Sequence, residues 1–418
     1  MKIKENQNNK KKIVFKISEF PHVSETFIIA QIITAIQLNY AVVILVNKAL
    51  DFEQSLHEDL LLKYKLNEFI VLEDVKIPKN KIIKCFKIFY LFISNLSHLK
   101  NMLNFYKFQK EKSFSWIFYW IFYKQFDDSN TIFHIQYGNN KFPIDVLKAK
   151  CNFKAKVITT FHGHDAFFPM QGFIPNDGYY DLLFESADII TANTPYLADK
   201  IKKLNCPPEK LKIIPVGVDT NFFNVLDRVQ KSKSILKLIN VGRLDPVKGQ
   251  KYLIQIVNQI LEKGINVHLD IVGEGAERNN LEQIIRKYNL AESIKLVGEK
   301  SESEIKEMYL KSDLYLFAAV PLPNGRRETQ GLATLEAQAC GLPVIAYNSG
   351  GVKYTIKDNV TGFLFDEFEI EKVVKKLLFL NENRAVIYEM SNNCYKFVAK
   401  NYSQNVVTEK WFSIYSNL

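Results

Sequence analysis

Two glutamates eight positions apart, Glu328 and Glu336, offer the clearest chemistry in this chain. Gly331 interrupts the loop before them, residues 332–340 read as a short helix, and residues 343–346 read as a buried strand. The N-terminus of a helix presents unpaired N–H groups and a partial positive charge, which suit a phosphate group. Carboxylates repel phosphate, so the two glutamates are predicted to bind sugar hydroxyls. A nucleotide-sugar, with a diphosphate between two polyols, suits both kinds of group.

A pair of cations is predicted to face the phosphates. Arg243 and Lys248 follow the predicted strand 235–241, and ligands of a parallel sheet bind beyond the carboxyl ends of its strands. Arginine binds pyrophosphate through two parallel hydrogen bonds and lysine as a point charge. Two loop cations alone would be read as solvated side chains. The flanking glycines and the two glutamates favour a phosphate site.

The order of these motifs over residues 236–366 resembles that of the family-4 retaining glycosyltransferases. The segment from Glu328 to Glu336 resembles their Glu-x7-Glu signature, and other stretches follow in the family's order: 240–249, 272–275, 297–298, 348–352 and 359–364. Several ordered motifs are a specific signal, whereas each alone is weak.

The resemblance implies roles for the residues of the Glu-x7-Glu segment. Glu336 would accept hydrogen bonds from the ribose hydroxyls, and Glu328 would contact the transferred sugar. Backbone N–H groups of Gln330, Gly331 and Leu332 would complete the phosphate contacts. Gln330 departs from the family, because many members carry an aromatic residue there. The plain alternative for Glu336 is an acid that complements the helix dipole.

Gly273 and Gly298 mark two further turns at which the backbone could approach a nucleotide. The Gly-x-Gly at 273–275 is equally consistent with a sharp turn between strand and helix. It lacks the third glycine of a dinucleotide fingerprint, which argues against a nicotinamide enzyme.

The first half of the chain supplies histidines and an aspartate near the ends of predicted strands. In the segment 160–165, His162 by resemblance contacts the donor sugar near the reacting carbon, and Asp165 is a candidate for binding the acceptor. His134 begins a His-x-x-x-Gly turn with an expected role on the acceptor side. The alternative for a lone loop histidine is a hydrogen bond to the backbone.

Residues 21–27 close the first predicted strand and open a helix. Most family members carry a glycine pair here, whereas this Ser-Glu-Thr-Phe form resembles exopolysaccharide glycosyltransferases of the colanic-acid type. Ser24 is a predicted N-cap. Ser24 and Thr26 are expected to contact the diphosphate at this helix N-terminus.

Thirteen strand-like runs alternate with helical stretches, which predicts α/β architecture with parallel sheets. The expected fold is two doubly wound Rossmann-like domains, and the resemblance implies GT-B, in which they face each other across a cleft. We predict an acceptor-binding domain over 1–217 and a nucleotide-sugar-binding domain over 218–400. A C-terminal helix over 401–418 is expected to return to the first domain.

Composition narrows the remaining possibilities. The five cysteines form no Cys-x-x-Cys pair, so neither a disulfide framework nor a zinc site is indicated. Because the chain has no Asp-x-Asp motif, no metal or cofactor is expected beyond the donor substrate. The polar N-terminus and the lack of a run of ~20 apolar residues predict a cytoplasmic protein.

Residues 76–126 hold ten lysines and one glutamate, a net charge of +9 out of the chain's +10, among many aromatic residues. Three interpretations are open: surface helices with aromatics in the core, contact with an anionic membrane, or nucleic-acid binding. The apolar run 116–123 favours a membrane-contact segment on the inner face of the cell membrane. Nucleic acid is disfavoured because no known binding module surrounds the segment.

These features together predict a retaining hexosyltransferase-type enzyme that moves a sugar from a nucleoside-diphosphate sugar to a glycan or lipid-linked acceptor in surface polysaccharide synthesis. The alternatives are another GT-B enzyme, such as a nucleotide-sugar epimerase or a phosphorylase, and a non-catalytic protein that binds membranes or RNA. No pyridoxal lysine motif supports the phosphorylase. A non-catalytic protein would not explain the Glu-x7-Glu segment.

Overall fold

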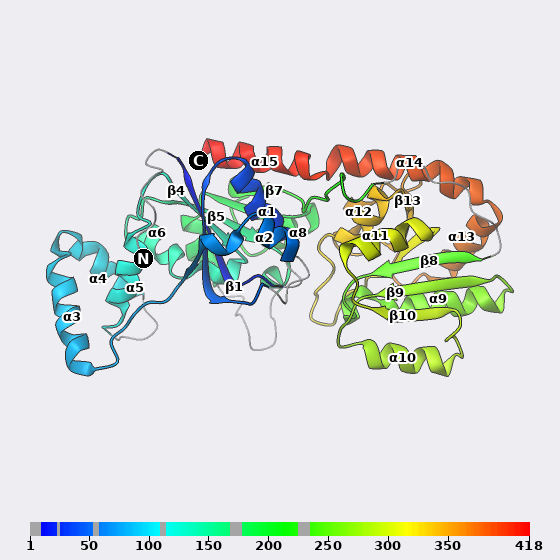
Figure 1. The fold of residues 1–418 in the computed structure, drawn as a ribbon, viewed down its shortest axis with the longest axis horizontal. Coiled ribbons are helices and arrows are strands. Elements are labelled where there is room, and N and C mark those ends of the chain that lie inside the picture. The colour runs from blue at the N-terminus through cyan, green and yellow to red at the C-terminus, as the bar shows by residue number, and fades with distance from the viewer. Residues whose placement is uncertain (1–9, 23–25, 53–57, 109–113, 168–177, 225–234) are drawn as a thin grey trace. The chain divides into compact units, whose positions relative to one another are not determined.

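A computed structural model describes residues 10–22, 26–52, 58–108, 114–167, 178–224 and 235–418 (Figure 1). Its contacts divide the chain into two compact units. The first unit comprises the chain up to Ala192, Ala198–Ile213 and Phe412–Leu418, and the second comprises Asn193–Leu197 and Ile214–Trp411. The chain thus enters the second unit twice, at Asn193 and again at Ile214.

The first unit is built on a seven-stranded sheet with the order β3-β2-β1-β4-β5-β6-β7 and parallel pairing throughout. Its strands are β1 Lys12–Phe20, β2 Ala41–Ala49, β3 Ile70–Leu72, β4 Thr131–Gln136, β5 Lys156–Phe161, β6 Ile189–Ala192 and β7 Leu211–Ile213. Its helices are α1 Thr26–Gln37, α2 Glu58–Lys63, α3 Lys81–Ile93, α4 Leu99–Lys107, α5 Trp116–Lys124, α6 Ile144–Lys150, α7 Asp181–Ser186 and α8 Pro195–Lys202, the last starting in the second unit. All six residues of β4 are buried, as expected for a parallel sheet covered on both faces.

The second unit has a six-stranded parallel sheet with the order β10-β9-β8-β11-β12-β13. Its strands are β8 Leu236–Val241, β9 Val267–Val272, β10 Ile294–Gly298, β11 Leu314–Phe317, β12 Val344–Tyr347 and β13 Gly362–Phe365. Its helices are α9 Gln250–Glu262, α10 Arg278–Lys287, α11 Glu302–Lys311, α12 Leu332–Ala339, α13 Ile370–Glu382, α14 Arg384–Asn401 and the start of α15 Gln404–Asn417. Successive strands run outward from β8 to β10, and the chain then returns to β11 on the other side. The loops after β8 and β11 therefore meet at the switch point where such sheets bind ligands.

The thirteen predicted strands each coincide with an observed strand, and the predicted class of two doubly wound α/β domains is confirmed. The last turns of α15 contribute Tyr415 to the core of the first unit, where its ring lies beside those of Tyr40 and His134.

Residues 76–126, here called the basic aromatic segment, differ from the expectation in their most apolar run, 116–123. Helix α5 carries the run 116–123, and five of its residues are buried: Trp116, Ile117, Phe118, Trp120 and Tyr123. The expectation that this run contacts a membrane is therefore wrong for Trp116, Phe118, Trp120 and Tyr123, because their rings are buried in the core. Helix α3 has no buried residue and lies on the outer side of α4 and α5, away from the sheet (Figure 1).

Among the described residues no single helix is long and apolar enough to cross a bilayer. Helix α3 and the stretch Leu96–Lys107 reach the required length and apolarity only as a pair, which is bent by 72°.

Candidate functional site

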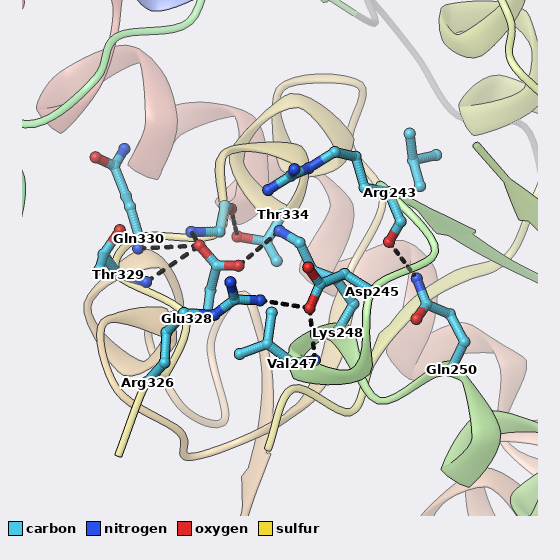
Figure 2. A network of polar contacts seen from close by, with 12 residues as sticks. Arg243, Asp245, Val247, Lys248, Gln250, Arg326, Glu328, Thr329, Gln330 and Thr334 are labelled. Carbon is cyan, nitrogen blue, oxygen red and sulfur yellow. Dashed lines mark hydrogen bonds and ion pairs between the residues drawn. The ribbon is translucent and has the colours of Figure 1, made fainter. Parts of the chain in front are cut away.

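The loops that follow β8 and β11 bring Lys248 and Glu328 together at the switch point of the second sheet (Figure 2). Lys248 ends the short 3-10 helix Pro246–Lys248, and Glu328 lies just before α12. The Lys248 Nζ and Glu328 Oε2 atoms are 2.6 Å apart, and the two side chains are 20% and 13% exposed. Two residues 80 positions apart in the chain thus form one partly buried ion pair.

The second carboxylate oxygen of Glu328 lies against the backbone before α12. Oε1 accepts hydrogen bonds from the N–H groups of Thr329 at 3.1 Å, Gln330 at 3.4 Å and Gly331 at 3.2 Å. Burial raises the pKa of Glu328, but Lys248 and the backbone N–H groups outweigh it and leave the pKa below its ordinary value. Glu328 is therefore ionised at neutral pH. It accepts hydrogen bonds both from Lys248 and from the N–H groups predicted to bind phosphate.

A second ion pair braces the loop after β8. Asp245 caps the 3-10 helix by accepting from Val247 N at 3.0 Å, and its Oδ1 atom also accepts from Arg326 at 2.5 Å. The side-chain amide of Gln250 donates to the Arg243 carbonyl oxygen at 2.9 Å. These contacts fix the backbone between the two predicted phosphate ligands, while the Arg243 side chain itself is exposed.

Two glycines from the loop after β12 pack directly beneath the Glu328 loop. The Gly351 N–H donates to the Glu328 carbonyl oxygen at 2.8 Å. A Cβ atom added to Gly351 would overlap the carbonyl oxygen of Thr329, and one added to Gly350 would overlap that of Glu328. Only glycine allows the two backbone segments to approach so closely.

Replacing Gly351 by alanine should therefore lower the free energy of unfolding by about 1–3 kcal/mol, the usual cost of overpacking, and displace the Glu328 loop. Chemical denaturation measures the first effect. The matched control is Gly264→Ala, where nothing lies within 4 Å of the added Cβ but φ is +76°, so only backbone strain is introduced. Equal stability of the Gly351→Ala variant and the unmodified protein would show that the loop tolerates displacement.

Glu336 is the fifth residue of α12, about one turn from its start, and its Oε2 atom is 3.5 Å from the hydroxyl group of Tyr309. Burial raises the pKa of Glu336 to about 7, the nearby charge of Glu302 adds to the rise, and Tyr309 opposes it. The carboxyl group is thus half-ionised near neutral pH, and a ligand that donates hydrogen bonds to it would favour the ionised form.

Gln330, the departure from the family pattern, has a structural role in this chain. Its side-chain amide makes two hydrogen bonds of 2.9 Å to the backbone N and O atoms of Val216. Thr194 donates to the Thr329 carbonyl oxygen at 2.7 Å. The loop that carries Glu328 is therefore fixed to two segments from earlier in the chain, 193–197 and 214–217, within the second unit.

In the first unit, His162 follows β5 and its ring is held by a buried pair of glutamines. Its Nε2 atom is 2.8 Å from the Gln136 side-chain oxygen, and the Gln136 amide nitrogen donates to Gln31 at 2.6 Å. The rings of Phe27 and Tyr137 lie 4.5 and 4.6 Å from the imidazole ring. Burial, followed by the charge of His164, lowers the pKa of His162 to about 3, so the ring is neutral at physiological pH.

The structure gives His134 and Asp165 positions that differ from their predicted contacts with an acceptor. His134 is fully buried, with Nδ1 2.8 Å from the Tyr415 hydroxyl and Nε2 2.7 Å from Thr160 Oγ1. Asp165 is also fully buried, and it accepts from the N–H groups of Gly138 at 2.8 Å, His162 at 3.1 Å and Gly163 at 2.8 Å. Buried contacts within the protein thus hold both side chains, and Asp165 contacts the loop of His162.

The remaining predicted residues have simpler placements. Gly273 has a φ of 129° and donates to the Gly298 carbonyl oxygen at 2.8 Å, and a Cβ atom added to Gly273 would overlap the carbonyl oxygen of Gly242. Leu332 begins α12 and Thr26 begins α1. Ser24 lies outside the described residues. Among the described residues no cluster of three or more His, Cys, Asp or Glu side chains could hold a metal ion.

Arg326, Gln136 and Tyr309 were not predicted from the sequence. No local pattern links Arg326 to Asp245, which lies 81 positions away. Asp245 itself carries a signal, since an Asp-Pro step favours the start of a turn.

Two family models match the chain. The model described as glycosyl transferases group 1 matches residues 225–400, and the model described as glycosyltransferase family 4 matches residues 101–222. Among curated proteins, the chain is 26% identical over 265 residues to WcaL of Salmonella typhimurium, whose name assigns it to colanic acid biosynthesis. It is also 26% identical over 254 residues to the amylovoran biosynthesis glycosyltransferase AmsK of Erwinia amylovora. The matches cover 62% and 61% of this chain, and 64% and 62% of the relatives, less than two thirds of either.

Solved structures share the fold at low sequence identity. A structure of HepE from Anabaena in complex with UDP has a TM-score of 0.70 at 16% identity, covering 98% of this chain and 100% of that one. A structure of TarM has a TM-score of 0.69 at 14% identity, covering 97% of this chain and 98% of that one.

Proposed function

Because the chain belongs to the family-4 glycosyltransferases with the GT-B fold, we propose that it is a retaining hexosyltransferase of surface polysaccharide synthesis. The donor would be a nucleoside-diphosphate sugar. The acceptor would be a glycan or a lipid-linked saccharide in the assembly of exopolysaccharide, capsule or lipopolysaccharide. The observation that carries the proposal is the Lys248–Glu328 pair at the N-terminus of α12, where cation, N–H groups and carboxylate converge.

In the proposed reaction, the bond between the anomeric carbon and the diphosphate oxygen breaks, and the acceptor hydroxyl bonds to that carbon on the same face. The hydroxyl proton passes to the departing diphosphate. Lys248, Arg243 and the N-terminus of α12 would stabilise the negative charge on the leaving group, since fixed charges placed where charge develops lower the barrier. We propose that these groups suffice without a metal ion, so that a chelator should leave the rate unchanged.

The carboxylates would bind hydroxyls instead of phosphates. Glu336 is proposed to accept from the ribose and Glu328 from the transferred sugar, with Gly273 and Gly298 allowing the nucleotide close to the backbone. Lys248 and Glu328 contact each other at 2.6 Å. A sugar that binds Glu328 would therefore release Lys248 to bind the diphosphate. The neutral ring of His162 is proposed to hold the sugar.

The partner surface is proposed to be an anionic membrane at its cytoplasmic side. A lipid-linked acceptor would be presented there, and the excess of lysines in 76–126 would be attracted to acidic headgroups. Nucleic acid, the competing partner for a basic surface, is not favoured by the family to which the chain belongs.

A screen of nucleotide-sugars by thermal shift tests the donor site. A first panel contains UDP, UDP-glucose and their GDP and ADP counterparts, because two structures of HepE are complexes with UDP and with UDP-glucose. A ligand present at 100 times its Kd should stabilise the protein by about 2.7 kcal/mol and raise the melting temperature. The Lys248→Met variant should lose this shift. If no nucleoside diphosphate or nucleotide-sugar stabilises the unmodified protein, the proposal is wrong.

A further inference from the structure

Helix α3 exposes a continuous apolar face that no part of the described chain covers. The exposed fractions of its large apolar side chains lie between 51% and 73%: Ile82, Ile83, Phe86, Phe89, Tyr90 and Ile93. At helical spacing these residues form one stripe, which we call the α3 face. The opposite side of the helix contacts α5. A patch of this kind is uncommon on a protein without a partner and marks an interaction surface.

The charges around the α3 face favour an acidic partner. Residues 76–108 contain seven lysines and no aspartate or glutamate: Lys76, Lys79, Lys81, Lys84, Lys87, Lys100 and Lys107. By helical geometry Lys81 and Lys87 lie on either side of the stripe. Two copies of this chain would bring these lysines against each other, which disfavours self-association through the α3 face.

The shape of the segment favours a lipid surface and shallow insertion. An amphipathic helix with aromatic residues on one face and lysines beside it lies in the plane of the interface, with its apolar side chains among the acyl groups. The break between α3 and the stretch Leu96–Lys107, bent by 72°, would keep the pair from crossing as one helix. Asn95 at this break is buried and accepts from Lys124 at 2.7 Å, so the bend is anchored to α5.

We infer that α3 is the element that inserts this protein into the surface of an anionic bilayer, with the α3 face among the acyl chains and the lysines on the headgroups. The inference rests on the proposed function, because it specifies how the enzyme would reach a lipid-linked acceptor. The sequence favoured the run 116–123 of α5 as the membrane contact. In the structure the rings of α5 are mostly buried, and α3 packs against α5.

The native cysteines provide the test. Cys85 lies on α3 and is exposed, whereas Cys151, Cys206, Cys340 and Cys394 are buried. An environment-sensitive fluorophore on Cys85 of the full chain should shift to the blue with vesicles of phosphatidylcholine and phosphatidylglycerol, and much less with phosphatidylcholine alone. Lipids with quenchers at known depths should quench it near the headgroups. A Cys85→Ser, Arg286→Cys protein labelled on α10 should show no shift, because Arg286 is an exposed residue of the second unit.

The double variant Phe86→Ser, Phe89→Ser should lower the vesicle partition coefficient by about 100-fold or more, since two buried rings are lost. Neither ring is buried in the fold, so the melting temperature should be unchanged. The matched control removes two exposed rings elsewhere, Tyr288→Ser and Phe379→Ser, and should bind vesicles normally. Undiminished binding of the α3 variant, or no vesicle binding by the unmodified protein, would overturn the inference.

Two readouts separate this inference from the proposed function. The thermal shift with nucleotide-sugars should be the same in the α3 variant and the unmodified protein, because the donor site lies in the second unit. Vesicle binding without any donor binding would support the role of α3 and overturn the proposed enzyme. A concentration-dependent dimer that the α3 variant abolishes, measured by light scattering, would identify a second copy as the occupant and overturn the membrane role.

Discussion

The variant Glu328→Gln should transfer sugar about 10²–10³ times more slowly than the unmodified protein, the usual effect of removing one fixed charge-stabilising group. The amide keeps the size of the side chain but removes the charge that pairs with Lys248 at 2.6 Å. Because the donor binds mainly through its nucleotide and diphosphate, kcat should fall much more than donor affinity. Initial rates and donor titrations by calorimetry give the two quantities separately.

Stability must be measured beside activity in this variant. Loss of a hydrogen bond to a charged group costs about 1–3 kcal/mol, and the partial exposure of Lys248 places the expected loss at the low end. The control Glu307→Gln removes a surface carboxylate that pairs with Lys311 at 3.2 Å, and it should change neither rate nor stability. Turnover of Glu328→Gln near that of the unmodified protein would remove Glu328 from the mechanism.

Donor affinity should weaken by about tenfold for each pH unit below 7 and stay constant above it, if Glu336 binds the ribose as a carboxylate. The sign follows from the pKa of about 7 for Glu336 in the free protein. Below that pH the carboxyl group is protonated, and the donor must displace a proton to bind. A nucleotide-sugar is the suitable probe because its phosphates remain ionised throughout this range.

Two variants check the assignment of this pH dependence. Glu336→Gln should flatten the profile and bind the donor about 10²-fold more weakly at pH 8, because two charge-assisted hydrogen bonds are lost. Glu302→Gln should move the midpoint to lower pH, since the charge of Glu302 contributes to the raised pKa of Glu336. Calorimetry in buffers of different ionisation enthalpy should detect up to one released proton below pH 7. A flat profile in the unmodified protein would exclude Glu336 from donor binding.

The fold was largely predictable from the sequence because parallel strands are buried on both faces. Runs such as Val344–Tyr347 are therefore apolar throughout and bounded by turn residues. The basic aromatic segment was less predictable. Aromatic residues at helical spacing indicate a buried face, but the pattern does not show whether protein or lipid covers it. Trp116 and Trp120 meet the core, while Phe86 and Phe89 do not.

The site was predictable where the backbone geometry requires particular residue types or spacings in the sequence. Glycines and the spacing of Glu328 and Glu336 indicated the loops of the second unit, and the structure brings Lys248 to Glu328. The direction in which a side chain points is not indicated by such patterns. His134 lies on a strand whose residues are all buried, so its ring faces Thr160 and Tyr415 instead of a ligand.

The close backbone approaches have a consequence for engineering donor choice by directed evolution. Added Cβ atoms would meet main-chain carbonyl groups at Gly249, Gly273, Gly275, Gly350 and Gly351. A library that randomises whole loops around the nucleotide would spend most of its members on chains that cannot close these loops. Diversity is better confined to loop residues with exposed side chains, while the five glycines and the proposed diphosphate ligands Arg243 and Lys248 are kept constant.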